Sequence, residues 1–212
     1  MNKKFEIGDI TKLNANFYLQ EDVVRAAKTL IGKIIVTCFN NEITAARIVE
    51  TEAYKGVVDK ASHAYGGRRT ARTETMYARG GVAYVYLCYG IHHLFNVVTN
   101  AENIPHAVLI RAAEPLLGIE IMSNRMKKAP TDYSLTKGPG NLSKALGITV
   151  ACTGISLTGD DVFIAEDHYV PHPALIKASP RIGVNYAGED ASLPYRFFLD
   201  KNRYVSGKKT IP

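Results

Sequence analysis

The fold depends on the stretch Ala45-Ala46-Arg47-Ile48-Val49-Glu50-Thr51-Glu52-Ala53-Tyr54. It is rich in β-branched residues, which favours a strand. Side chains on a strand alternate between its two faces, so Glu50, Glu52 and Tyr54 share a face with Ile48. That face runs from apolar to acidic and aromatic, as it does where a core strand reaches the mouth of a cleft. The pattern predicts either a strand that carries chemistry or an amphipathic strand whose glutamates meet water.

Composition places the chain among ordinary globular proteins. Of its 212 residues 46% are hydrophobic, enough to bury a sizeable core. Lys and Arg outnumber Asp and Glu by 26 to 20, and the formal charge of +6 favours a polyanionic partner. The cysteines, Cys38, Cys88 and Cys152, form no CxxC pair, and the six histidines lack ligand spacing. Neither a disulfide framework nor a zinc site is predicted.

The compartment is predicted from the same features. Met1 to Glu6 lack the apolar stretch of a signal peptide, and no run of about 18 or more apolar residues occurs in the chain. Unpaired cysteines fit a reducing compartment. We therefore expect a soluble cytoplasmic protein that does not enter a membrane.

No repeat, low-complexity tract or long polar linker divides the chain, so one domain over residues 1–212 is expected. Periodicity predicts helices at 21–30, 116–126 and 142–146, and strands at 34–38, 45–54, 82–87, 94–99, 107–112, 162–165, 181–186 and 196–199. Asn141 is the expected N-cap of the last helix, and Gly147 follows its end. Several connections are too short for helical crossovers. The expected fold class is α+β, a single mixed domain with a mostly antiparallel curved β-sheet and flanking helices.

A second informative segment is Tyr84-Val85-Tyr86-Leu87-Cys88-Tyr89-Gly90. Tyr84 and Tyr86 share a strand face and can pack or line a pocket. Tyr89 stands beside a glycine at a predicted hairpin tip. Exposed there, it can stack on bases or wedge between them, whereas the alternative is a tyrosine that folds back onto the sheet.

Upstream of this hairpin lies a basic, flexible stretch, Gly66-Gly67-Arg68-Arg69-Thr70-Ala71-Arg72. Its glycines and its three arginines, Arg68, Arg69 and Arg72, are suited to following phosphates. A solvated loop has a similar composition.

Taken together, these residues resemble the alkyladenine (3-methyladenine) DNA glycosylase family of base-excision repair, from about Asn16 to Ser206. The motifs that carry the resemblance are Arg47-Ile48-Val49-Glu50-Thr51-Glu52-Ala53-Tyr54, His63 with Gly66-Gly67-Arg68, Tyr84-Val85-Tyr86-x-x-Tyr89-Gly90 with Asn96, Leu109-Ile110-Arg111-Ala112-Ala113-Glu114-Pro115, Gly138-Pro139, and Arg181-Ile182-Gly183-Val184. Asn141 departs from the pattern, since a basic residue is expected after Gly-Pro-x, and Lys144 is the nearby candidate for that phosphate contact. His92-His93 also differs from the aromatic residues that some members carry.

The resemblance implies a catalytic group. Glu52 matches the carboxylate that activates water, and Arg111 matches an arginine close to that water. The backbone carbonyl of Ile182 is implied as a further contact of the water. Glu50 has no matched catalytic role, so we expect it to make a structural hydrogen bond or ion pair.

The resemblance also implies a base pocket and a wedge. Tyr54, His63 and Tyr86 match the walls of the pocket that receives a flipped base. Asn96 matches a side chain beside the bound purine. Tyr89 matches the residue inserted into the minor groove, so the hairpin is expected to protrude and enter DNA.

The implied function is that of a DNA repair glycosylase. It flips an alkylated or deaminated purine out of duplex DNA and hydrolyses the N-glycosidic bond with a Glu-activated water, leaving an abasic site. The implied enzyme is a monofunctional hydrolase, because no lysine falls at a matched catalytic position. It is implied to need no cofactor and no metal, to act as a monomer on damaged double-stranded DNA, and to have access to the chromosome.

Two rival functions remain open from the sequence. A glycoside hydrolase would use Glu50 and Glu52 as a pair, since such neighbours lie roughly 7 Å apart on a strand. The absence of tryptophan and the basic charge count against it. A non-catalytic nucleic-acid-binding module would use the basic surface and Tyr89 without needing Glu52.

Overall fold

The computed structural model describes residues 7–207, so the N-terminal residues examined for a signal peptide, 1–6, and the last five, 208–212, lie outside the described residues. The strands are β1 (Thr11–Lys12), β2 (Ile34–Phe39), β3 (Glu42–Tyr54), β4 (Ala83–Cys88), β5 (His92–Thr99), β6 (His106–Leu117), β7 (Val162–Glu166), β8 (Ile176–Ser179) and β9 (Arg196–Leu199). The α-helices are α1 (Val23–Leu30), α2 (Ile119–Met126) and α3 (Pro139–Leu146). The expected α+β fold class is confirmed.

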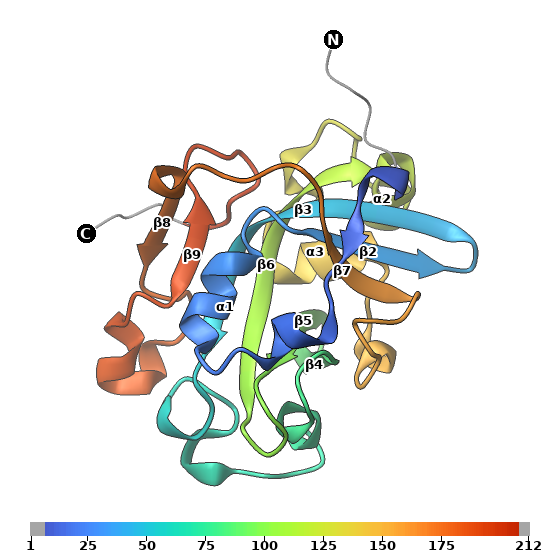
Figure 1. The fold of residues 1–212 in the computed structure, drawn as a ribbon. Helices are drawn as coiled ribbons and strands as arrows, with labels where there is room; N and C mark the ends of the chain where they lie inside the picture. Colours follow the sequence, from blue (N-terminus) through green and yellow to red (C-terminus); the bar gives the residue numbers. More distant parts are fainter. Residues whose placement is uncertain (1–6, 208–212) are drawn as a thin grey trace.

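The strands form one antiparallel sheet, curved and flanked by the helices (Figure 1). Its order is β1-β7-β2-β3-β6-β5-β4, and β9 pairs with both β3 and β8. The long strand β3 pairs with β6 along one edge, while its other edge pairs first with β2 and then with β9. The change of partner falls at Glu50 to Glu52, where the pairing with β6 also shifts register. This part of β3 is therefore enclosed by strands on both edges.

Helix α1 covers the same part of the sheet. Asp22 caps its start by accepting hydrogen bonds from the backbone N–H groups of Val24 and Arg25, and its apolar face is buried in the core. The Thr51 hydroxyl, on the opposite face of β3 from its glutamates, donates to the Ala27 carbonyl at 2.9 Å. The helix thereby fixes the position of β3 at the residues that flank Thr51.

Strands β4 and β5 form a hairpin with Tyr89 and Gly90 in its turn. Both have left-handed backbones, with φ of +51° and +73°. Such a turn matches the twist of an antiparallel pair. The predicted hairpin is thus present.

One predicted strand is wrong, and one predicted helix begins later than expected. Residues 181–186 form no strand, because Arg181 turns inward to bind Asp59 and Gly183 has a left-handed backbone (φ +77°). The helix predicted from 116 begins only at Ile119, because Leu116 and Leu117 complete β6 and Gly118 (φ +71°) breaks the strand.

The predicted N-cap of the last helix is also wrong. Asn141 lies inside α3, which begins at Pro139 after Gly138. Proline is well suited to the first position of a helix, because the N–H it lacks would have had no partner there. Strand β8 was not predicted. None of the helices within residues 7–207 is both long and apolar enough to span a bilayer.

Candidate active site

Glu52, near the C-terminal end of β3, has a carboxylate that is 0% exposed. Its Oε1 accepts a hydrogen bond from the backbone N–H of Ile182 at 2.8 Å and lies 3.3 Å from Nη1 of Arg111. Its Oε2 accepts a hydrogen bond from the Tyr54 hydroxyl at 2.9 Å. The alternative of glutamates that meet water is therefore wrong, and the Ile182 N–H contacts Glu52 in addition to the water contact expected of the Ile182 carbonyl.

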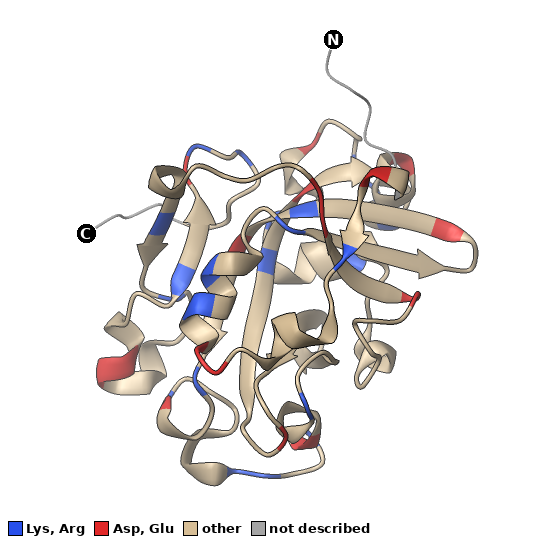
Figure 2. Ribbon diagram, viewed as in Figure 1, with Lys and Arg blue, Asp and Glu red and all other residues tan. Residues whose placement is uncertain are grey.

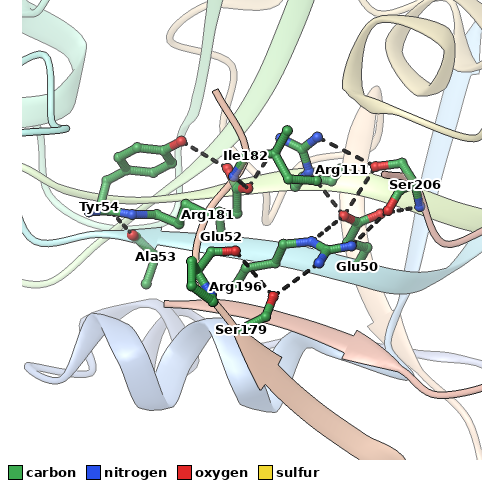
Figure 3. A network of polar contacts seen from close by, with 11 residues as sticks. Glu50, Glu52, Ala53, Tyr54, Arg111, Ser179, Arg181, Ile182, Arg196 and Ser206 are labelled. Carbon is green, nitrogen blue, oxygen red and sulfur yellow. Dashed lines mark hydrogen bonds and ion pairs between the residues drawn. The ribbon is translucent and has the colours of Figure 1, made fainter. Parts of the chain in front are cut away.

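Glu50 is equally buried but is fully engaged in structural contacts (Figure 3). Its Oε1 accepts from Nε of Arg196 at 2.7 Å, from Nε of Arg111 at 3.0 Å and from the Ser206 hydroxyl at 3.1 Å. Its Oε2 accepts from the Ser206 backbone N–H at 2.7 Å. The two carboxylates share one face of β3 as predicted, yet their surroundings differ.

Arg111 on β6 joins the two carboxylates. Its Nε binds Glu50 and its Nη1 faces Glu52, so one guanidinium holds both at fixed positions. Burial alone would lower the pKa of Arg111, but the charges of Glu52 and Glu50 outweigh burial and raise that pKa above its ordinary value. Arg111 is therefore a permanent cation beside Glu52.

A second buried arginine fixes the segment that supplies the Ile182 N–H. Arg181 donates to both oxygens of Asp59, at 2.5 and 2.8 Å, and to the Ala53 carbonyl at 2.9 Å. Its guanidinium carbon also lies 4.8 Å from the centre of the Tyr54 ring. Arg181 therefore sets both the backbone and the aromatic ring that bind Glu52.

A small cavity of about 40 Å³ opens beside this group. It is lined mainly by aromatic side chains. The lining residues are Tyr54, Ala61, His63, Met76, Tyr84, Tyr86, Asn96, Ala107 and Tyr186. The four residues predicted for the base pocket thus line one cavity, and Glu52 reaches it through the Tyr54 hydroxyl.

Contacts among its own side chains hold the aromatic wall of the cavity in place. The ring centres of His63 and Tyr86 are 4.5 Å apart at 77°, and Nδ1 of His63 lies 2.9 Å from the Tyr84 hydroxyl. Burial, and then the charges of Arg72 and Arg68, lower the pKa of His63 to about 4. His63 is therefore neutral at neutral pH. Burial followed by the charge of Glu52 raises the pKa of Tyr54, which remains a phenol and a hydrogen-bond donor.

Asn96 is buried on β5, where its side chain both lines the cavity and bonds the backbone. Its Nδ2 donates to the carbonyls of Tyr84 and Leu94, each at 3.1 Å. These two bonds fix the plane of the amide beside the cavity.

Tyr89 is 91% exposed at the hairpin tip, and Leu87 and Ile91 beside it are exposed as well. The alternative in which Tyr89 folds back onto the sheet is therefore wrong. The tip presents apolar side chains to solvent.

The candidate phosphate-binding side chains differ in how many contacts they already make within the protein. Figure 2 shows basic residues in the loop between η4 (Tyr65–Gly67) and η5 (Glu74–Tyr77), at the lower edge of the view. All three loop arginines are exposed, but Arg69 is held by Glu74, at 2.7 and 3.0 Å, and by Asn103 at 2.8 Å. Arg72 lies 5.3 Å from the centre of the Tyr86 ring, at the cavity wall.

Lys144 is exposed on α3 and lines a separate groove of about 570 Å³ with His92 and His93. The Asn141 amide donates internally to the carbonyls of Ser134 and Lys137. Within residues 7–207 no group of three or more His, Cys, Asp or Glu is placed to hold a metal ion.

Several members of the site carried no usable sequence signal. Tyr186 lies in η9 (Asn185–Ser192), lines the cavity and donates to the Ala61 carbonyl at 3.2 Å. Arg196 and Ser206 complete the surroundings of Glu50 from more than a hundred residues away. Tyr84, which also lines the cavity, did have a sequence signal, because it alternates with Tyr86 on one strand face.

The chain is similar to known proteins over most of its length. Residues 16–203 match the family model described as methylpurine-DNA glycosylase (MPG). Three bacterial relatives carry the name "Putative 3-methyladenine DNA glycosylase". The relative from Desulfitobacterium hafniense (strain Y51) is 43% identical over 204 residues, covering 93% of this chain and 99% of the relative. Those from Chlamydia felis and Clostridium perfringens are 45% and 41% identical, covering 89% and 93% of this chain and 96% and 100% of the relatives.

Proposed function

The chain belongs to the methylpurine-DNA glycosylase family, and on that premise we propose that it releases alkylated or deaminated purines from duplex DNA by hydrolysis. The observation that carries the proposal is a carboxylate, Glu52, held without solvent exposure next to an aromatic cavity. The family match over residues 16–203 supports one glycosylase domain. The enzyme acts inside the cell, where it has access to the chromosome, and as a monomer.

Glu52 serves as the general base. A carboxylate has about four acceptor positions, and three are taken by Ile182, Arg111 and Tyr54. The remaining position on Oε2, next to the cavity wall formed by Tyr54, is available to orient a water. Because its other contacts are fixed, the carboxylate needs little rearrangement during the reaction.

The reaction is an exchange of one bond for another. The water oxygen forms a bond to C1′ of the deoxyribose, the C1′–N bond breaks with its electron pair going to the purine, and Glu52 takes the proton from the water. A cationic alkylated purine thereby leaves as a neutral base. The carboxylate also stabilises the positive charge that develops on the sugar.

The cavity recognises damage through charge. An alkylated purine is electron-poor or cationic, so the faces of Tyr54 and Tyr86 attract it more strongly than a normal base, by about 1 kcal/mol or more when desolvated. A neutral His63 adds no repulsion to this selection, since its pKa is lowered to about 4.

The base reaches the cavity by flipping. Rotating a nucleotide out of the duplex costs a few kcal/mol, and least where damage has weakened pairing. Tyr89, exposed at the hairpin tip, inserts into the vacated space and offsets part of that cost. Arg68, Arg72 and Lys144 are the candidate phosphate contacts with the fewest internal bonds. Because Arg69 is already bound to Glu74 and Asn103, its contribution is expected to be smaller.

A carboxylate-pair glycoside hydrolase is disfavoured by the surroundings of Glu50. That carboxylate accepts hydrogen bonds from Arg111, Arg196 and Ser206. It is too firmly engaged to act as an acid or a nucleophile. A non-catalytic binding module is disfavoured because it would not need the buried carboxylate of Glu52 beside the cavity.

The test is base release from duplexes that each carry one lesion: 3-methyladenine, 7-methylguanine, hypoxanthine or ethenoadenine. We expect a free purine and an abasic site from at least one duplex, none from undamaged DNA, and affinity that falls steeply with salt. Borohydride should trap no covalent adduct, because no amine attacks the sugar. Tight lesion binding without release would instead support the binding module.

A further inference from the structure

Arg196 on β9 is a buried arginine that does not line the cavity. It is the cross-strand partner of Glu52 in the pairing of β3 with β9, but its side chain turns to Glu50. Its three nitrogens make three separate contacts: Nε with Glu50 at 2.7 Å, Nη1 with the Ser179 hydroxyl at 3.0 Å and Nη2 with the Ser206 carbonyl at 2.7 Å. One side chain thus ties together β3, the end of β8 and the chain after β9 (Figure 3).

We propose that Arg196 is a positioning residue that holds the general base Glu52 through two arms, one passing through Glu50 and Arg111 and the other through Ser179 and Ile182. The proposal rests on the proposed function, in which Glu52 activates water. Both arms end on Oε1 of Glu52, which leaves Oε2 for the water.

The first arm is ionic. Arg196 and Arg111 both donate to Oε1 of Glu50, so Glu50 holds the two guanidiniums side by side. Ser206 locks this arrangement, because its N–H and hydroxyl both donate to Glu50. Arg111 is then fixed with Nη1 at 3.3 Å from Glu52.

The second arm runs through the backbone. Ser179, the last residue of β8, accepts from Arg196 and donates to the Pro180 carbonyl at 3.1 Å. Two residues after Pro180 the chain delivers the Ile182 N–H to Glu52. Losing Arg196 releases the start of this short segment, although Arg181 still holds its middle.

The arms also set the charge around Glu52. Two carboxylates, Glu50 and Glu52, are balanced by two guanidiniums, Arg111 and Arg196. Arg181 and Asp59 form a further neutral pair. The other titratable groups near Glu52 are the phenols of Tyr54, Tyr86 and Tyr186.

Removing the charge of Arg196 therefore leaves two buried carboxylates with one nearby cation. Arg111 is then drawn toward Glu50, and protonation within the carboxylate pair becomes easier. A general base works only when ionised. The acidic limb of the pH–rate profile is thus expected to move to higher pH.

The experiment measures single-turnover base release against pH, lesion-DNA affinity and thermal unfolding for three variants. The acidic half-point is the pH, on the acidic side of the profile, at which the rate is half of its plateau value. For Arg196→Gln we expect this half-point to rise by about one pH unit. For Glu50→Gln/Arg196→Gln, which restores charge balance, we expect the half-point to return toward the wild-type value. For Arg196→Lys, which keeps the charge but loses the fork of three contacts, we expect the half-point to stay and the plateau rate to fall about tenfold.

Arg47→Gln is the matched control. Arg47 is a partly buried arginine on the same strand as Glu52, paired with Asp167 at 2.7 Å. Its loss should lower the unfolding temperature while leaving the half-point unchanged. Lesion affinity should remain within about twofold in the Arg196 variants, since Arg196 does not line the cavity.

The outcomes separate the inference from the function beneath it. If Glu52→Gln keeps the wild-type rate, the proposed function is wrong, because Glu52 does not act as the general base. If Glu52→Gln is inactive but both Arg196→Gln and Arg196→Lys keep the wild-type plateau and half-point, only the positioning role is wrong. If Arg196→Gln does not fold, Arg196→Lys and Ser206→Ala decide, and wild-type plateaus in both overturn the proposal.

Discussion

The C-terminal end of β3 and the tip of the β4–β5 hairpin depart from ordinary burial in opposite directions. At the end of β3, Glu50 and Glu52 are withdrawn from water and bound by arginines. At the hairpin tip, Tyr89 and Ile91 stand in solvent, and Tyr89 adopts a left-handed backbone. One region buries charge and the other exposes apolar surface.

Both arrangements oppose stability, and they do so in different ways. Burying a charge is unfavourable unless it is paired and hydrogen-bonded, which explains the dense contacts around both glutamates. A left-handed backbone costs a non-glycine residue about 1 kcal/mol, and an exposed apolar tip gains nothing from the core. In the proposed function, the first region is fixed in advance for chemistry and the second keeps free surface for DNA.

The largest expected effect is that of Glu52→Gln, which removes the base and keeps the shape. An amide cannot accept the proton of the water, so single-turnover base release should slow by at least about a hundredfold while lesion binding survives. Glu114→Gln on β6 is a matched control that should keep the wild-type rate. A near-normal rate for Glu52→Gln would direct attention to Glu50.

Tyr89→Ser should have the next largest effect, at the other region. Losing the wedge should reduce excision from duplex DNA roughly tenfold, in line with the loss of one stacking contact. A lesion in an unpaired strand should be excised almost normally, because no flipping is needed. Equal losses on both substrates would mean that Tyr89 has no wedge role.

Asn96→Ser should change selectivity more than rate. Guanine carries an exocyclic amino group that adenine and hypoxanthine lack, and the fixed Asn96 amide beside the cavity is expected to exclude it. A misfit of this kind costs about 1–3 kcal/mol, so the ratio of guanine-type to hypoxanthine excision should rise about tenfold or more in the variant. Asn100→Ser, outside the cavity, is the control. An unchanged ratio for Asn96→Ser would mean that Asn96 does not exclude guanine.

The smallest effect on activity is expected from His63, whose titration should appear in stability. Its pKa is lowered to about 4 by burial and then by Arg72 and Arg68, so between that value and the ordinary 6.5 the folded protein binds fewer protons than the unfolded chain. Stability is full above pH 6.5 and should fall toward pH 4, by up to about 3 kcal/mol. Thermal unfolding of His63→Gln should depend less on pH, although His106, whose pKa is also lowered by burial, keeps part of the slope. An identical slope in both proteins would exclude this role.

Local patterns predicted a large part of the two regions. Alternation along β3 placed Glu50 and Glu52 on one face, and a glycine after Tyr89 located the hairpin tip. Both signals depend on neighbours within a few residues, which is where periodicity and turn chemistry operate.

The remaining features depend on contacts that no local pattern encodes. Arg181 was predicted in a strand, but its ion pair with Asp59 reaches across 122 positions and bends the chain. Ser206 meets Glu50 across 156 positions, and Tyr186 meets Ala61 across 125. Burial of charge at β3 required these distant partners, so the sequence alone left open whether its glutamates meet water.

The most direct test of this division of labour compares single-turnover base release by Glu52→Gln and Tyr89→Ser on the same lesion, placed once in a duplex and once in an unpaired strand. We expect Glu52→Gln to be slowed by the same factor on both substrates, because chemistry follows flipping. We expect Tyr89→Ser to be slowed on the duplex alone. If Tyr89→Ser is equally slow on both substrates, or if Glu52→Gln recovers on the unpaired strand, the assignment of chemistry to β3 and of flipping to the hairpin is wrong.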